Sequence, residues 1–238
     1  WSEEEKGRIT HIIKSITVNI HKKGFNLQFP DTVFMIKTNA KEESGAAGYT
    51  RANYIVLKDN IMNIPYNRLR KTVTHELFHV LSRNDSMLRR ELYSAIGFTV
   101  CNEVKYPPEL AAFRMSNPDA PKNHAFIHLR AGEENVECMM ILYSDRPYRD
   151  GSFFDYLNIG FLRVSGEDQN KQIVYQGDKA VVYEPDEVSG FFEQIGNNTN
   201  YIIHPEEILA ENFVFALQGI QGLPSPEIIE KISEKMRE

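Results

Sequence analysis

The chain has 238 residues, of which 42% are hydrophobic and 25% are charged, and its formal net charge is −6. This hydrophobic content is enough for a sizeable core, and there is no run of about 18 apolar residues that would cross a bilayer as a helix. Lys and Arg are scattered rather than gathered into a basic stripe, which excludes the charge pattern of nucleic-acid-binding proteins. We therefore expect a folded protein that neither spans a membrane nor binds nucleic acid.

The first residue and the cysteines bear on the cellular compartment. The chain begins at Trp1 rather than at Met, as expected after removal of a leader segment or a tag, so a secreted or cell-envelope location is slightly favoured over a cytoplasmic one. Cys101 and Cys138 belong to no CxxC pair and form no disulfide framework. We expect two buried thiols, with a single disulfide as the alternative. These features leave the compartment open.

The N-terminal third of the chain predicts a helix, two neighbouring strands and a second helix. Isoleucines recur at three- and four-residue spacing within residues 2–21, which is typical of an amphipathic helix. The β-rich runs 32–38 and 48–59 are separated by a polar, glycine-containing loop and predict neighbouring strands. After Pro65, apolar residues mark one side of a helix that we expect to end near Asn84.

The remainder predicts a β-rich insert enclosed by helices. A further helix follows over residues 87–98, capped at Asp85 or Ser86. Several β-like runs divided by Gly, Asp and Asn turns fill residues 124–184, and they predict an antiparallel meander. Residues 204–220 then return to a helical pattern, and a polar terminal helix covers 225–238. No internal repeat is apparent.

Residues 75–79 read HELFH inside the second predicted helix. His75 and His79 are four residues apart and share one face, so both imidazoles can reach one tetrahedral ion. Glu76 is placed to reach a metal-bound water without binding the metal itself. The alternative is an ordinary helix with two surface histidines. However, the flanking residues are uncharged and predict deep burial, where this triplet makes little sense without a metal. We therefore expect a zinc ion.

A catalytic zinc needs a third protein ligand, and two acidic stretches compete for that role. Glu103 is nearer in sequence, but Pro107 stands where an acidic partner would be one turn later. Glu207 has such a partner in Glu211, which can hold a ligand histidine by its second ring nitrogen. We favour Glu207 as the ligand, with Glu103 and Glu206 as alternatives.

HELFH followed by EILAENF at residues 207–213 resembles the gluzincin zinc metallopeptidases, in particular the lethal-factor-like group, whose second motif reads approximately EFFAEAF. The resemblance covers about thirty residues. It implies that Glu207 binds zinc and that Glu211 supports a ligand histidine. It also implies that Tyr201 stabilises an oxyanion, although Tyr201 lies six residues before Glu207 rather than about seven. His204 is the alternative donor.

Together, motif and resemblance imply one α+β, zincin-like domain over residues 1–238. In it the active-site helix packs on a small mixed sheet, the C-terminal part is helical, and the β-rich insert separates the two ligand helices. The implied function is a zinc-dependent endopeptidase with Glu76 as general base, acting on a peptide extended along an edge strand at 48–59. The alternative is an inactive zincin-fold protein that binds partners through the insert. The substrate, the oligomeric state and any latency of the enzyme stay open.

Overall fold

The computed structural model describes residues 1–238, apart from the side chain of Met62. It has an α+β fold, which confirms the expected fold class. The seven α-helices of this described chain are α1 (Glu3–Lys23), α2 (Tyr66–Asn84), α3 (Ser86–Ala95), α4 (Pro108–Ala111), α5 (Phe191–Ile195), α6 (Pro205–Gln218) and α7 (Pro226–Lys235). Among them, none combines the length and the apolar content that a bilayer crossing requires.

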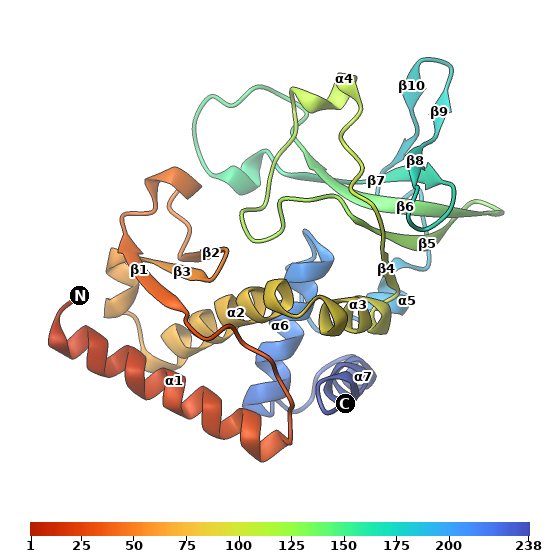
Figure 1. The fold of residues 1–238 in the computed structure, drawn as a ribbon. Helices are drawn as coiled ribbons and strands as arrows, with labels where there is room; N and C mark the ends of the chain where they lie inside the picture. Colours follow the sequence, from red (N-terminus) through yellow and green to blue (C-terminus); the bar gives the residue numbers. More distant parts are fainter.

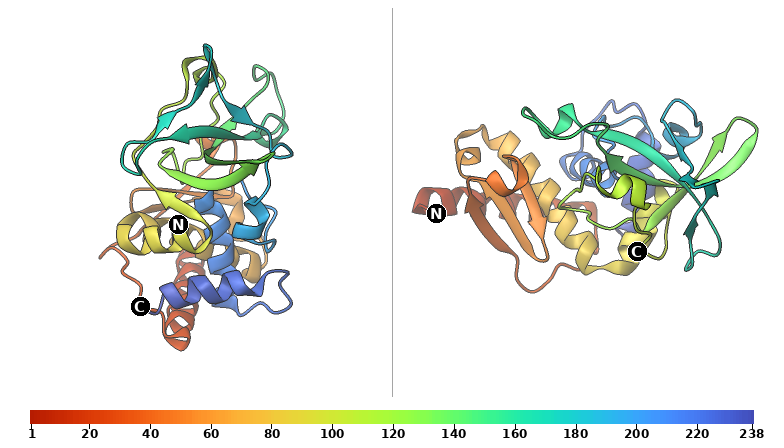
Figure 2. Two further views of the ribbon diagram at one scale, coloured as in Figure 1. Left: turned by 90° about the vertical axis from the view of Figure 1, so that its right-hand side faces the viewer. Right: turned by 90° about the horizontal axis from the view of Figure 1, so that it is seen from above.

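The strands form one small mixed sheet, one larger antiparallel sheet and a two-stranded ribbon. The strands are β1 (Phe34–Thr38), β2 (Gly48–Arg51), β3 (Tyr54–Lys58), β4 (Phe98–Val100), β5 (Ala125–Ala131), β6 (Glu134–Tyr143), β7 (Asn158–Ser165), β8 (Gln172–Ile173), β9 (Tyr175–Gln176), β10 (Lys179–Ala180) and β11 (Val182–Tyr183). The large sheet lies above α2, α3 and α6, while α1 and α7 lie on the opposite side of these helices (Figure 1; Figure 2, left).

The predicted N-terminal helix is confirmed and has a clear start and stop. The Ser2 hydroxyl accepts a hydrogen bond from the N–H of Glu5, while the Glu5 carboxylate accepts one from the N–H of Ser2. This reciprocal cap satisfies two N–H groups that the first turn leaves free. The helix ends at Gly24, which takes a left-handed conformation. Its isoleucine face packs into the main core.

The run 48–59 is a hairpin, so the prediction of a single strand there was wrong. β2 and β3 pair antiparallel and turn at Ala52, which has φ of 49°. Alanine is uncommon in this left-handed region, where glycine or asparagine would mark the first position of a hairpin turn. β1 pairs parallel with β3, and the strand order β1–β3–β2 leaves β2 at one edge. α2 packs against β2 and β3, as expected for a helix on a small mixed sheet.

The antiparallel meander expected at 124–184 is confirmed, but its sheet begins earlier in the chain. Strands run in the order β11–β7–β6–β5–β4, with β8 also paired to β7. β4 lies at Phe98–Val100. Its first residue, Phe98, was predicted to be the last residue of a helix. α3 stops instead at Ala95, and Gly97 with φ of 83° turns the chain into the strand. The insert is thus continuous with the strand that follows α3.

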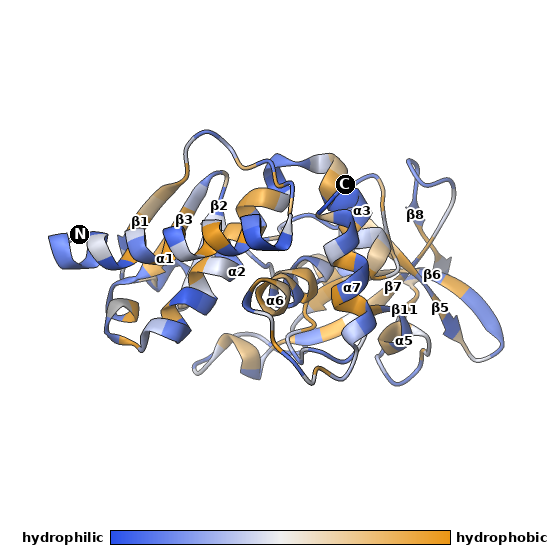
Figure 3. Cartoon of the chain, turned by 90° about the horizontal axis from the view of Figure 1, so that it is seen from below, coloured by the Kyte–Doolittle hydropathy of each residue, from blue (hydrophilic) through white to orange (hydrophobic). Residues whose placement is uncertain are grey.

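α6 lies at the centre of the fold. Figure 3 shows it as a largely hydrophobic helix between α1, α2 and α7. The main core cluster contains side chains of the helices together with one face of the large sheet, among them Leu77, Phe213, Ile127 and Phe161. Because α6 is covered on all sides, its glutamates are buried as well. A polar group in this position needs partners, and these partners form the site described below.

Both cysteines are free and buried, as predicted. Burial raises the pKa of Cys101 to about 11 and that of Cys138 to about 12. Only the thiolate reacts with disulfide reagents, so at pH 8 the reactive fraction is about one part in a thousand or less.

We expect no reaction of the native protein with an aromatic disulfide reagent over minutes. Unfolding in guanidinium without reductant should release two reactive thiols. An unfolded, unreduced protein without reactive thiols would instead reveal a disulfide between Cys101 and Cys138.

Candidate metal centre

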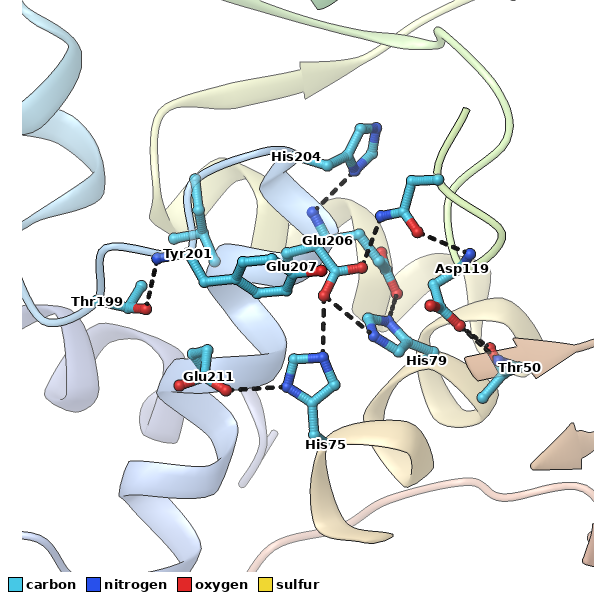
Figure 4. Close-up of polar contacts among 12 residues, drawn as sticks. Thr50, His75, His79, Asp119, Thr199, Tyr201, His204, Glu206, Glu207 and Glu211 are labelled. Carbon is cyan, nitrogen blue, oxygen red and sulfur yellow. Dashed lines mark hydrogen bonds and ion pairs between the residues drawn. The ribbon is translucent and has the colours of Figure 1, made fainter. Parts of the chain in front are cut away.

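Two histidines of α2 and one carboxylate of α6 meet in the buried contact between these helices (Figure 4). Nε2 of His75 lies 2.9 Å from Oε2 of Glu207, and Nε2 of His79 lies 3.5 Å from the same oxygen. The ligand atoms that these three residues offer all lie within 4.8 Å of one another. The structure therefore brings together a buried group that can hold a metal ion, formed by the three residues favoured from the sequence.

Each imidazole is held by a second carboxylate on its other ring nitrogen. Nδ1 of His75 lies 3.1 Å from Oε1 of Glu211, and Nδ1 of His79 lies 3.3 Å from Oε1 of Glu206. A carboxylate can only accept, so each Nδ1 carries a proton, and in a neutral imidazole the lone pair is then on Nε2. Both lone pairs thus face Glu207, which is the arrangement in which protein carboxylates orient metal-binding histidines.

Glu206 is a support for His79, a role that the sequence analysis did not foresee. We considered Glu206 only as an alternative metal ligand, because adjacent glutamates on a helix cannot be distinguished without knowing how the helix is rotated. Its Oε2 accepts hydrogen bonds from Ser82 Oγ at 3.0 Å and from Tyr93 OH at 2.8 Å. Burial opposes ionisation of Glu206, but the contact with His79 and the Tyr93 hydrogen bond outweigh it and lower its pKa. His79 is therefore held by a buried, fully bonded carboxylate.

The segment 115–121, which precedes the insert, adds two polar side chains that the sequence analysis missed. Asn117 Nδ2 donates to Oε1 of Glu207 at 2.6 Å, which leaves Oε2 for the histidines. Asp119 accepts hydrogen bonds from the N–H of Thr50 at 2.6 Å and from its hydroxyl at 2.7 Å. In the sequence these residues form the run NPDAP, whose composition is typical of a turn. A turn composition does not indicate which distant residues the side chains of the turn contact.

Glu76 lies beside the histidines and is buried, with 4% of the residue exposed. Its carboxylate does not have all of its hydrogen-bond partners. Its Oε2 has no hydrogen-bond partner within the described residues. Burial, together with the charge of Asp119, raises the pKa of Glu76 to about 8. β2 passes close over this side chain, because a Cβ added at Gly48 would lie 2.7 Å from Oε1 of Glu76. Only glycine allows the edge strand to approach so closely.

The electrostatics of the site fit a bound cation. Burial opposes protonation of both histidines, yet hydrogen bonds to Glu207 and Glu211 raise the pKa of His75 to about 9. The charges of Glu207 and Asp119 likewise outweigh burial and raise the pKa of His79 well above its usual value. Even so, Nε2 of His79 is buried and lacks a hydrogen-bond partner in the described part of the chain. A metal ion would occupy that nitrogen and balance the surplus of carboxylates.

The other candidates from the sequence fall in different surroundings. Tyr201 lies beside His75, with ring centroids 6.2 Å apart, and its ring extends toward Glu207 (Figure 4). His204 caps α6, since its Nδ1 accepts a hydrogen bond from the N–H of Glu206 at 3.1 Å. Burial lowers the pKa of His204 to about 4. The Glu103 side chain is half exposed. It belongs to neither of the two groups of potential metal ligands in the described residues, which are His75 with His79 and Glu207, and Glu76 with His79 and Asp119.

Comparisons with protein-family models, with curated proteins and with solved structures find no match for this chain.

Glu207→Ala and Glu103→Ala form a matched pair for the third ligand. Loss of a carboxylate oxygen from a three-residue site should weaken metal binding by about 100-fold or more, whereas loss of a surface carboxylate should leave it unchanged. A competition titration of zinc against a chelator measures both. Retention of wild-type affinity by Glu207→Ala, with loss in Glu103→Ala, would reverse the assignment.

Glu211→Ala and Glu206→Ala should each lower zinc affinity by about 10- to 100-fold, because the ligand histidine stays but loses its orienting partner. Glu211→Gln should be milder than Glu211→Ala, since an amide oxygen still accepts from Nδ1. Thermal unfolding of the metal-free proteins serves as the control, because Glu206 also bonds two buried hydroxyls. Wild-type affinity in both alanine variants would show that neither carboxylate supports the site.

Proposed function

We propose that this protein is a zinc-dependent peptidase with a zincin-like fold, in which His75, His79 and Glu207 hold the ion. The donor set supports zinc, since two imidazole nitrogens and one carboxylate leave a fourth position open, as in catalytic zinc sites. Calcium and magnesium prefer sites built from oxygen alone. When bound, zinc would polarise the scissile carbonyl and lower the pKa of a coordinated water toward neutrality.

One observation carries this proposal. Two carboxylates on α6, Glu206 and Glu211, hold the outer nitrogens of the two histidines, and both inner nitrogens face a single oxygen of Glu207. An ordinary buried neutral histidine needs an acceptor for one ring nitrogen and a donor for the other, whereas here both nitrogens of each ring face carboxylates, which only accept. A site that must bind a metal ion needs the orientation that these outer contacts supply.

Glu76 would move the proton in hydrolysis. It follows His75 directly in the sequence, but its carboxylate is not part of the group formed by the three ligands. A cation held by the neighbouring ligands would favour the ionised form of Glu76, and its Oε2, which has no partner among the described residues, could then accept the proton of the attacking water. The same carboxylic acid then donates that proton to the amine that leaves when the peptide bond breaks. Glu76 alone would therefore serve as both the general base and the general acid of peptide hydrolysis.

Tyr201 is the better of the two candidate donors to the developing oxyanion. Burial and the surrounding carboxylates raise the pKa of Tyr201 above its usual value, so its hydroxyl keeps the proton that it would donate. His204, by contrast, uses Nδ1 to cap α6, and its lowered pKa keeps the ring neutral. We therefore assign His204 a structural role and Tyr201 the catalytic one.

Glu76→Gln should retain stoichiometric zinc and lower kcat/KM for a cleavable peptide by about 100- to 10,000-fold, because the amide keeps the shape but cannot carry the proton. Metal analysis and peptide cleavage on the same preparation measure both. Loss of zinc from this variant would make Glu76 a ligand rather than a base.

The alternative of an inactive zincin-fold binding protein makes a different prediction for the wild type. It would bind one zinc ion and cleave no member of a random peptide library, whereas the peptidase cleaves a subset of it. Wild-type protein that is zinc-loaded and inert would therefore favour the binding protein.

A further inference from the structure

A cavity of about 380 Å³ opens beside the metal centre. Asn117, Asp119 and Tyr201 line it on the side of the centre. Phe153 and Phe154 also line it, and both come from the connection between β6 and β7 in the β-rich insert. A group that fills this cavity therefore lies next to the residues that would perform the chemistry.

A row of rings links the insert to a metal ligand. The Phe154 ring lies 6.4 Å from the Tyr201 ring, which itself lies 6.2 Å from His75. Phe154 is 59% exposed, although its ring also packs against that of Phe153, 5.5 Å away. Its backbone is held in place, because the Ser152 hydroxyl accepts a hydrogen bond from the N–H of Phe154. The structure thus presents an apolar ring to solvent at the wall of the cavity.

β2 offers a short free edge at the same cavity. The N–H of Thr50 points away from β3, because it donates to Asp119. Residues two apart in a strand direct their backbone groups to the same side, and the bond from Lys58 N to Ala47 O fits this alternation. The N–H and C=O of Gly48, which also lines the cavity, therefore face away from β3. Because the N–H of Thr50 is already bonded to Asp119, the part of the β2 edge that can pair with another strand ends at Gly48.

Both acidic residues of the cavity wall have partners within the chain. Glu43 forms an ion pair with Arg51, and Oδ1 of Asp119 accepts both hydrogen bonds from Thr50. A basic side chain entering the cavity would have to compete with Arg51 for Glu43. The large side chains without a polar group that line the cavity are Phe153, Phe154 and Ile203. Desolvation of this surface favours an apolar group.

We propose that this cavity is the specificity pocket, that it receives one large apolar side chain of the peptide substrate, and that Gly48 pairs with the backbone of that peptide. The inference rests on the proposed peptidase function. It assigns the insert a role in substrate selection, because Phe153 and Phe154 belong to it. The peptide backbone would pass over Glu76, against which Gly48 is packed.

The cleavage test uses peptides that differ at one randomised position. Wild type should cleave peptides with Phe or Leu at the selected position at least about 10-fold faster, in kcat/KM, than those with Ala or Lys. Phe154→Ala should reduce this ratio several-fold. Tyr148→Ala is the matched control, because Tyr148 is exposed in the same connection but does not line the cavity, and its ratio should stay at the wild-type value. A preference for Lys, or a ratio that Phe154→Ala leaves unchanged, overturns the inference.

A binding test keeps this inference separate from the peptidase proposal. In the zinc-loaded Glu76→Gln protein, a fluorescent peptide with Phe should bind at least about 10-fold more tightly than its Ala counterpart, and adding Phe154→Ala should remove most of that difference. Equal affinity for both peptides overturns the specificity pocket even if the wild type is a peptidase. Selective binding without any cleavage by the wild type supports the pocket and contradicts the proposed hydrolysis.

Discussion

The shared contact of two imidazoles with one carboxylate oxygen, inside the packing of α2 against α6, is the constraint on which the rest of the structure depends. Glu207 and His79 are almost completely inaccessible, so neither charge can be compensated by water. α6 meets this requirement with two more glutamates, each on the outer nitrogen of one histidine. The resulting surplus of negative charge, around a ring nitrogen without a hydrogen-bond partner, is what a divalent cation would balance.

The insert contributes to this site rather than only extending the distance between its two helices. The segment that leads into it carries Asn117, which holds the second oxygen of Glu207, and Asp119, which closes part of the β2 edge. The connection between β6 and β7 places Phe153 and Phe154 at the cavity. One face of the insert sheet also shares the main core with the helices. Metal binding and substrate selection would thus depend on segments far apart in the chain.

The sequence predicted those parts of the molecule that depend on local periodicity. The helices around His75 and Glu207 and the meander after His124 follow from the spacing of apolar residues. The hairpin at Ala52 did not, because its turn has an alanine where sequence rules expect glycine or asparagine. Asn117, Asp119 and the support that Glu206 gives His79 were also missed. Their contacts join residues about 70 to 130 positions apart and have no periodic signature.

Anomalous diffraction from crystals grown with one equivalent of zinc would show whether His75, His79 and Glu207 together hold the ion. We expect one strong peak, bonded to Nε2 of both histidines and to a carboxylate oxygen of Glu207 at about 2.0–2.2 Å. A peak bonded to Glu76 or Glu103 in place of Glu207, or a crystal in which both Nε2 atoms bind no metal, would contradict it.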